Sequence, residues 1–137
     1  MKKTLKFIAF SAILLMLAGS FFSCKDTEEY DIYSLHNISA CGVNDPLQNI
    51  EWLREIVGEL KKDAEAGYKQ HARIYQCHYK DGIGFLLELC VDCPDYGYWL
   101  RGCDGESLCV LWGYAGDSCS DFDVDFENKT LILEINN

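Results

Sequence analysis

The chain has 137 residues, with 22 acidic and 12 basic side chains, a formal net charge of −10 and eight cysteines. This length suits one globular domain of a size that gains from covalent cross-links. The acidic surface repels phosphate backbones, which argues against nucleic acid as a partner and favours cations or a basic protein surface.

The first segment has the layout of a secretory signal peptide. Three lysines in the first six residues precede an apolar run from Phe7 to Leu17, and small residues follow. This order of basic, apolar and small residues predicts export. A membrane-spanning anchor is the alternative, but residues 7–22 are fewer than the about 20 that a spanning helix needs.

Cys24 stands at the boundary between this apolar stretch and an acidic one. The motif Phe21-Phe22-Ser23-Cys24 resembles the lipobox of bacterial lipoproteins, although Phe21 replaces the usual leucine-like residue. The resemblance implies that residues 1–23 are removed and that Cys24 is lipidated, with ordinary cleavage near Ser20 as the alternative. The charged run 25–29 is similar to the export tag of Bacteroidota surface lipoproteins and implies exposure on the outer face.

Removal of the signal peptide changes the charge balance. All 22 acidic residues and nine of the 12 basic residues lie after residue 23, so the mature chain has a formal charge of −13. Residues 24–40 show no hydrophobic periodicity and are interpreted as a flexible tether. The single globular domain is therefore expected over residues 41–137.

The start of this domain predicts one helix that ends near Gly67. Asp45 is a favourable N-cap residue, Pro46 suits the first helical position, and Gln48 completes a capping-box pattern. Apolar residues recur at helical spacing up to Leu60, which predicts one buried stripe and an otherwise solvated surface.

Four short runs after the helix are rich in aromatic and branched residues, which predicts strands: HARIYQCHYK, IGFLLELCV, GYWLRGC and ESLCVLW. Asp81-Gly82 lies between the first two runs and Asp104-Gly105 between the last two. An Asp-Gly pair in this position is a strong hairpin signal. We therefore expect two hairpins joined by the segment DCPDY.

The last segment, DFDVDFENKTLILEI, predicts a third hairpin with Asn128-Lys129 as its turn. In this register the apolar residues pair on one face: Phe126 with Leu131, Val124 with Leu133, and Phe122 with Ile135. The other face gathers four carboxylates: Asp121, Asp123, Asp125 and Glu134.

Such a carboxylate face could hold Ca²⁺, which accepts six to eight oxygen ligands. The spacing departs from that of an EF-hand, because Phe126 replaces the turn glycine and Ile132 replaces the bidentate glutamate. A solvated strand face is the alternative interpretation, so these residues are weak calcium candidates only.

Seven cysteines remain once Cys24 is assigned to lipid, and in an exported domain they are disulfide candidates: Cys41, Cys77, Cys90, Cys93, Cys103, Cys109 and Cys119. An odd number allows at most three bridges and leaves one thiol, and the sequence does not select the pairing. Cys90-Val91-Asp92-Cys93 also has the spacing of a redox pair or half a zinc site. A turn with Pro94 follows it instead of a helix, which favours a structural disulfide.

Catalytic motifs are not found in the sequence. The three histidines His36, His71 and His78 accompany no hydrolase or zinc-protease motif. Cys77 and His78 are neighbours in an expected strand, so their side chains point to opposite faces. We expect no catalytic role and no cofactor.

Aromatic residues form the remaining candidate site. A binding platform for a sugar ring or a partner's side chains would use the residues near the middle turn and after the second hairpin: Tyr96, Tyr98, Trp99, Trp112 and Tyr114. Core packing is the alternative interpretation for the same residues.

Several motifs resemble those of small cysteine-rich lipoproteins of gut Bacteroidota: CGVNDP, IYQCHYKDG, GFLLELCVDCPDYGY, GYAGDSC and the ending DFDVDFENKTLILEIN. The resemblance covers residues 41–137, implies a bacterial outer-membrane setting and supplies no activity. IYQCHYKDG is also similar to the opening of lipid-anchored lysozyme inhibitors, but those are all-β barrels and the helix expected here argues against membership.

The expected fold is α+β, with one N-terminal helix packed on an antiparallel sheet of about five or six strands built from hairpins and stabilised by disulfides. The expected function is non-catalytic binding of a protein or glycan partner at the outer membrane or cell surface. Inhibition of a secreted protease or lysozyme, with the loop from Cys90 to Tyr98 as the plug, is the alternative. A cation-binding or thiol-active role is the third possibility.

Overall fold

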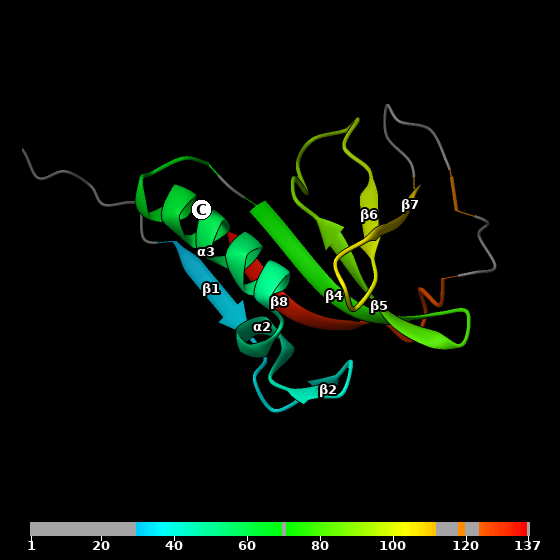
Figure 1. Ribbon diagram of the computed structural model, residues 1–137. Helices are drawn as coiled ribbons and strands as arrows, with labels where there is room; N and C mark the ends of the chain where they lie inside the picture. Colours follow the sequence, from blue (N-terminus) through cyan, green and yellow to red (C-terminus); the bar gives the residue numbers. More distant parts are fainter. Residues whose placement is uncertain (1–29, 70, 112–117, 120–123, 137) are drawn as a thin grey trace, which may run out of the picture.

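Figure 1 shows the computed structural model, which describes residues 30–69, 71–111, 118–119 and 124–136. Its main element is a six-stranded antiparallel sheet in the order β1-β8-β4-β5-β6-β7. The strands are β1 (Asp31–Ser34), β4 (His71–Tyr79), β5 (Gly82–Glu88), β6 (Tyr98–Arg101), β7 (Ser107–Leu111) and β8 (Thr130–Asn136). A separate small hairpin contains β2 (Ser39–Ala40) and β3 (Val43–Asn44), and the helices are α2 (Pro46–Asn49) and α3 (Glu51–Glu65).

The first two expected hairpins are confirmed. β4 pairs with β5 and β6 pairs with β7, each through a short connection. In the first hairpin Tyr79 faces Gly82, so the turn residues are Lys80 and Asp81, one position earlier than expected. Lys80 adopts the left-handed backbone conformation there, with a φ of 50°.

The third expected hairpin is wrong among the described residues. β8 lies between β1 and β4, where Leu131 faces Tyr75 and Leu133 faces Ile74. Val124 instead forms an isolated bridge with Tyr79. Burial explains the difference. Between β1 and β4 three apolar residues of β8 are fully buried, namely Ile132, Leu133 and Ile135. In a two-stranded ribbon one face of the strand would remain in contact with water.

The interpretation of residues 24–40 as a flexible tether is wrong for its second half. Asp31–Ser34 form β1, an edge strand of the main sheet, and Ser39–Ala40 form β2. Ile32 faces Ile135 across the sheet and packs against the core, which gives this stretch a buried side that a tether lacks. The helices therefore follow the first strand of the sheet, so the expected order, with the helix ahead of all the strands, is wrong.

The helical segment itself is interrupted. Ile50 has an extended backbone, with φ −95° and ψ 114°, and separates α2 from α3. The extended backbone directs the Ile50 side chain into the core, where it is 7% exposed. Asp45 adopts the left-handed conformation, and its side chain makes no capping hydrogen bond, so the predicted capping box does not form. Gly67 follows the end of α3 with a φ of 80°, as a C-terminal glycine does.

The two faces of the sheet are packed differently. On one face, α3 lies over β8 (Figure 1), and Leu47 of α2 packs into the same core. We call the buried residues there the helix-side cluster: Ala40, Leu47, Ile50, Leu53, Val57, Leu60, Ala64, Ala72, Ile74, Phe85, Leu87, Ile132, Leu133 and Ile135. We call those of the opposite face the second cluster: Cys77, Leu86, Leu100, Cys109, Leu111, Cys119 and Val124.

Candidate functional site

The cysteines form three disulfides, Cys41–Cys103, Cys90–Cys93 and Cys109–Cys119. Cys77 is buried and is the free cysteine of the part of the chain that the structure describes. Three bridges with one thiol left over confirm the prediction from the odd count. Burial raises the pKa of the Cys77 thiol to about 11, which keeps it protonated and unreactive at neutral pH.

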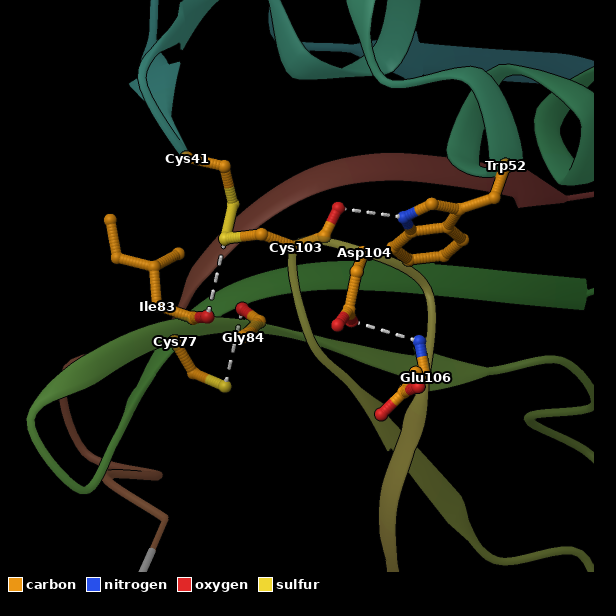
Figure 2. The surroundings of a disulfide bond; sticks show 8 residues. All are labelled: Cys41, Trp52, Cys77, Ile83, Gly84, Cys103, Asp104 and Glu106. Carbon is orange, nitrogen blue, oxygen red and sulfur yellow. Dashed lines mark hydrogen bonds between the residues drawn. A yellow bond between two sulfur atoms is a disulfide. The ribbon is translucent and has the colours of Figure 1, made fainter.

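The longest-range disulfide lies beside an open hollow in the surface. Cys41 lies in the turn of the small β2–β3 hairpin, and Cys103 lies in the β6–β7 loop, 62 residues further along the chain. Figure 2 shows the bond joining these two segments above β4 and β5, with the Cys77 thiol on the far side of the sheet. The bridge therefore fixes the small hairpin against the main sheet.

Trp52 of α3 packs beside this bridge. Its indole Nε1 donates a hydrogen bond to the carbonyl oxygen of Cys103 at 3.1 Å (Figure 2). The ring lies so close to Gly105 that a Cβ atom there would be 2.7 Å from the indole Cγ, and Gly105 has a φ of 83°. Phe85 meets the ring edge-on at 5.7 Å, and the Arg101 guanidinium lies 5.7 Å from the ring centre. The indole is thus held in one orientation.

An open hollow of about 500 Å³ lies at this junction. It is lined by residues of both helices, the small hairpin and the β6–β7 loop: Cys41, Val43, Asn49, Ile50, Glu51, Trp52, Glu55, Cys103 and Asp104. Three of them are carboxylates, and Glu51 and Glu55 are one helical turn apart on the same side of α3.

Among the described residues the three carboxylates of the hollow, Glu51, Glu55 and Asp104, form no ion pair. The Arg101 guanidinium beside the Trp52 ring is a nearby positive group. Asp104 accepts a hydrogen bond from the Glu106 backbone N–H at 3.0 Å, which orders the loop without neutralising the charge (Figure 2). The lining combines apolar surface with negative charge, which suits an amphipathic cation.

The expected calcium face is not assembled from the described residues. Asp125 accepts hydrogen bonds from the backbone N–H and the side chain of Asn128, at 3.1 and 2.8 Å, and these hold its pKa below the ordinary value. Glu134 lies on β8 and accepts a hydrogen bond from Arg73 at 2.7 Å. Asp121 and Asp123 lie outside the described residues. Within the described ranges no three His, Cys, Asp or Glu side chains are grouped to hold a metal ion.

Glu134 belongs to a row of charged side chains on the sheet face opposite the helices. Arg73 contacts Glu134 and also Glu88, the latter at 4.0 Å, and His71 lies 3.3 Å from both Glu134 and Asp92. The hydrogen bonds from Arg73 and then His71 lower the pKa of Glu134, and the Glu134 partner raises the pKa of Arg73. Because Arg73 and His71 both contact carboxylates of neighbouring residues, we interpret this row as a structural network, although its acidic groups outnumber its basic ones.

The predicted aromatic residues do not share one surface. Tyr98 packs in the second cluster against Phe126, and burial followed by the neighbouring Glu88 raises its pKa to about 12. Trp99 is the next residue of β6, and its side chain points to the other face of the sheet because neighbouring strand residues alternate. It is 37% exposed. Tyr96 is 47% exposed in the β5–β6 loop. Trp112 and Tyr114 lie outside the described residues.

Sequence reasoning missed two features that the structure brings together. Trp52 is next to the buried helical stripe, and its position between Glu51 and Glu55 was the available signal for the hollow. The second feature is a hydrogen-bonded chain of Ser34, His36 and Asp45. It was missed because residues 24–40 were interpreted as a tether, although an i, i+2 spacing places two side chains on one side of a strand.

Comparisons with protein-family models, with curated proteins and with solved structures gave no significant match. Across the residues that the structure describes, no helix has the length and apolar character needed to cross a membrane.

Proposed function

We propose that the chain is an extracytoplasmic lipoprotein, anchored to the outer membrane through Cys24, whose domain binds a basic segment of a partner protein. The signal-peptide layout and the lipobox-like motif support the location. The three disulfides agree with an oxidising compartment. The hollow beside Trp52, with three carboxylates that form no ion pair among the described residues, is the observation that carries the binding role.

A lysine or arginine side chain matches this lining better than a neutral sugar does. Its aliphatic stem can pack on Val43, Ile50 and the Trp52 indole while its charged head meets a carboxylate. A neutral glycan that filled the hollow would remove water from the carboxylates without replacing their favourable interactions. The acidic surface of the whole domain also speeds the approach of a basic partner.

The test is a calorimetric titration of the mature protein with a tetra-arginine peptide. A tetraglycine peptide is the neutral control. We expect saturable binding of the arginine peptide that weakens as salt is added, because the contacts are partly exposed charges. The double variant Glu51→Gln/Glu55→Gln should lose about tenfold or more in affinity, the equivalent of one charge-assisted hydrogen bond.

The matched control is Glu59→Gln/Asp63→Asn. These two residues are also one turn apart on α3 and exposed, and the net charge changes equally, but neither lines the hollow. Equal losses for the two double variants would show that total charge, and not the hollow, attracts the peptide. Absence of saturable binding to the unmodified protein would also refute the proposal.

The β5–β6 loop favours a second candidate function, inhibition of a secreted hydrolase. Its Cys90–Cys93 disulfide closes a short ring, and the residues after it are exposed up to Tyr96. A rigid, exposed loop loses little entropy when it enters an enzyme's active-site cleft. An inhibition assay against secreted proteases and lysozymes tests this idea. Loss of inhibition in Tyr96→Ala, but not in Glu51→Gln/Glu55→Gln, would show that the loop and not the hollow is the inhibitory site.

Anchoring through Cys24 has its own test. Mass spectrometry of the protein from bacterial membranes should find an acylated Cys24 as the first residue. A mature N-terminus near Ser20, or an unmodified Cys24, would contradict the anchor and leave the binding site to be judged separately.

A further inference from the structure

Three polar side chains form a hydrogen-bonded chain where β1 ends. The Ser34 Oγ is 2.9 Å from the His36 Nε2, and the His36 Nδ1 is 2.9 Å from the Asp45 Oδ2. An ionised carboxylate can only accept hydrogen bonds, so Nδ1 must carry a proton and donate it to Asp45. In the neutral imidazole, Nε2 is then the acceptor for the Ser34 hydroxyl. This is the order of groups that activates a serine nucleophile.

We propose that Ser34, His36 and Asp45 form a nucleophilic site that accepts acyl groups from small carboxylic esters. Ser34 is the nucleophile, His36 is the general base, and Asp45 is a positioning residue that fixes the imidazole tautomer. None of the three lines the hollow beside Trp52, so this inference does not depend on the proposed binding function.

Backbone hydrogen bonds fix both ends of this chain of side chains, Ser34 at one end and Asp45 at the other. Ser34 pairs with Leu133 as the last residue of β1. Asp45 has a φ of 48°, its N–H donates to the Ile38 carbonyl at 2.9 Å, and its carbonyl accepts from two N–H groups of α2. The Asp45 Oδ1 is buried and has no hydrogen-bond donor among the described residues, so His36 is the side chain that this carboxylate orients.

β1 also offers a donor for the negative charge that develops on a reacting carbonyl oxygen. The Leu35 N–H donates to the Ile132 carbonyl at 2.9 Å, which makes Leu35 and Ile132 a hydrogen-bonded pair of the antiparallel ladder. The N–H of Ser34, one residue earlier, therefore points away from β8 toward the open edge of the sheet. A carbonyl attacked by Ser34 can place its oxygen near this N–H, as in other serine hydrolases.

The site is accessible and shallow. The His36 side chain is 43% exposed and that of Asp45 is 24% exposed. Such a site suits a small or loosely held ester, since neither the hollow beside Trp52 nor the smaller one lined by Tyr33 and Glu134 includes Ser34 or His36.

The proposed reaction has two steps. The Ser34 Oγ bonds to the ester carbonyl carbon while its proton passes to the His36 Nε2. The bond from that carbon to the alkoxy or aryloxy oxygen then breaks, and the leaving group takes the proton from Nε2. Water next attacks the acyl-serine, gives a proton to Nε2 and releases the carboxylic acid, and the proton returns to Ser34.

The first test is labelling of the mature protein with an alkyl fluorophosphonate, in which Ser34 Oγ displaces fluoride from phosphorus. We expect peptide mass spectrometry to find the adduct on Ser34. The adduct should be absent from Ser34→Ala and about 100-fold or more slower to form in His36→Gln, since a general base contributes that much. Asp45→Asn should also slow labelling while Ser34 remains the labelled residue.

Ser39→Ala is the matched control. Ser39 lies on the neighbouring β2 and bonds to Asn44 at 2.6 Å, with no histidine partner, so its loss should leave the labelling rate unchanged. Circular dichroism shows which variants fold, and the unmodified protein decides the question even if a variant fails to fold.

The chain of hydrogen bonds could alternatively be a structural link between β1 and the residues before α2, and the experiment separates these roles. A structural link changes stability and does not make Ser34 reactive. An unlabelled Ser34 in the folded protein, under conditions that label a reference serine hydrolase, would overturn the proposal. Equal labelling rates in the unmodified protein and in folded His36→Gln would do the same.

p-Nitrophenyl acetate gives an independent readout. We expect release of about one equivalent of p-nitrophenol per chain in a burst, with acetyl found on Ser34. Acetyl found on the neighbouring exposed Tyr33 instead would contradict the assignment of Ser34.

Discussion

The two faces of the main sheet carry different kinds of side chain, although both are built from the same strands. Under α2 and α3 the buried side chains of the helix-side cluster are all apolar. The opposite face has the second cluster near one disulfide and the charged row around Arg73. Both candidate sites lie elsewhere, where the small β2–β3 hairpin and α2 meet the sheet. The faces provide stability, and this junction presents the side chains on which both proposals rest.

The largest effect is expected where a disulfide joins this junction to the sheet. Cys41→Ala/Cys103→Ala releases a loop of 62 residues, and the chain-entropy relation predicts a loss of about 4 kcal/mol in the free energy of unfolding. Cys90→Ala/Cys93→Ala opens a loop of only three residues and should cost about 2 kcal/mol or less. Urea denaturation measures both, and equal losses would contradict the special role of the junction.

Truncation of one leucine in each cluster tests whether both faces are true cores. Leu53 of α3 and Leu100 of β6 are both 0% exposed. Leu53→Ala and Leu100→Ala should each destabilise by about 3 kcal/mol, within the usual range for buried leucines. Leu108, at 41% exposure, is the control and should change stability by about 0.5 kcal/mol or less. A neutral Leu100→Ala would show that the second face contributes little.

The charged row predicts a dependence of stability on pH. The pKa of Glu134 lies below its ordinary value of 4.5, so its interactions stabilise the folded protein above the unfolded pKa. This contribution is lost as the pH falls through the lowered, folded-state pKa. Glu134→Gln should lose about 1 kcal/mol or less at neutral pH, since the pair is partly exposed, and should flatten the acid limb of the curve.

Thermal denaturation of Glu134→Gln from pH 3 to pH 7 is the measurement, with the exposed Glu59→Gln as the control. An acid limb that stays as steep in Glu134→Gln as in the unmodified protein would place the pH dependence in other carboxylates.

The smallest effect concerns the remaining thiol. Burial raises the pKa of Cys77 to about 11, so iodoacetamide at pH 8 should leave it unmodified in the folded protein. In urea, where the thiol is exposed, peptide mapping should find Cys77 alkylated. Rapid alkylation of the folded protein would show that the second cluster opens frequently.

Local sequence signals predicted much of the sheet and little of its long-range pairing. Asp81-Gly82 and Asp104-Gly105 identified two hairpins because turn chemistry acts over a few residues. The segment before Asn128 had a well-matched apolar register with β8, yet β8 is buried more completely between β1 and β4. Such a choice depends on strands distant in the sequence, which local periodicity does not describe.

The candidate sites were hidden for the same reason. Ser34 and His36 approach Asp45 only because β1 joins the sheet edge and the backbone turns at Asp45. Trp52 reaches Cys103 across a separation of 51 residues. The odd number of cysteines did predict one unpaired thiol, since counting needs no geometry, but the pairing required the fold.

The position of β1 also limits how far the domain can stand from a membrane. If Cys24 carries the proposed lipid, the covalent path from it to Asp31 is seven residues, which span about 25 Å at most when fully extended. The maximum length of this connection is comparable to the thickness of a bilayer's hydrocarbon core. A partner of the anchored domain would therefore bind close to the membrane surface.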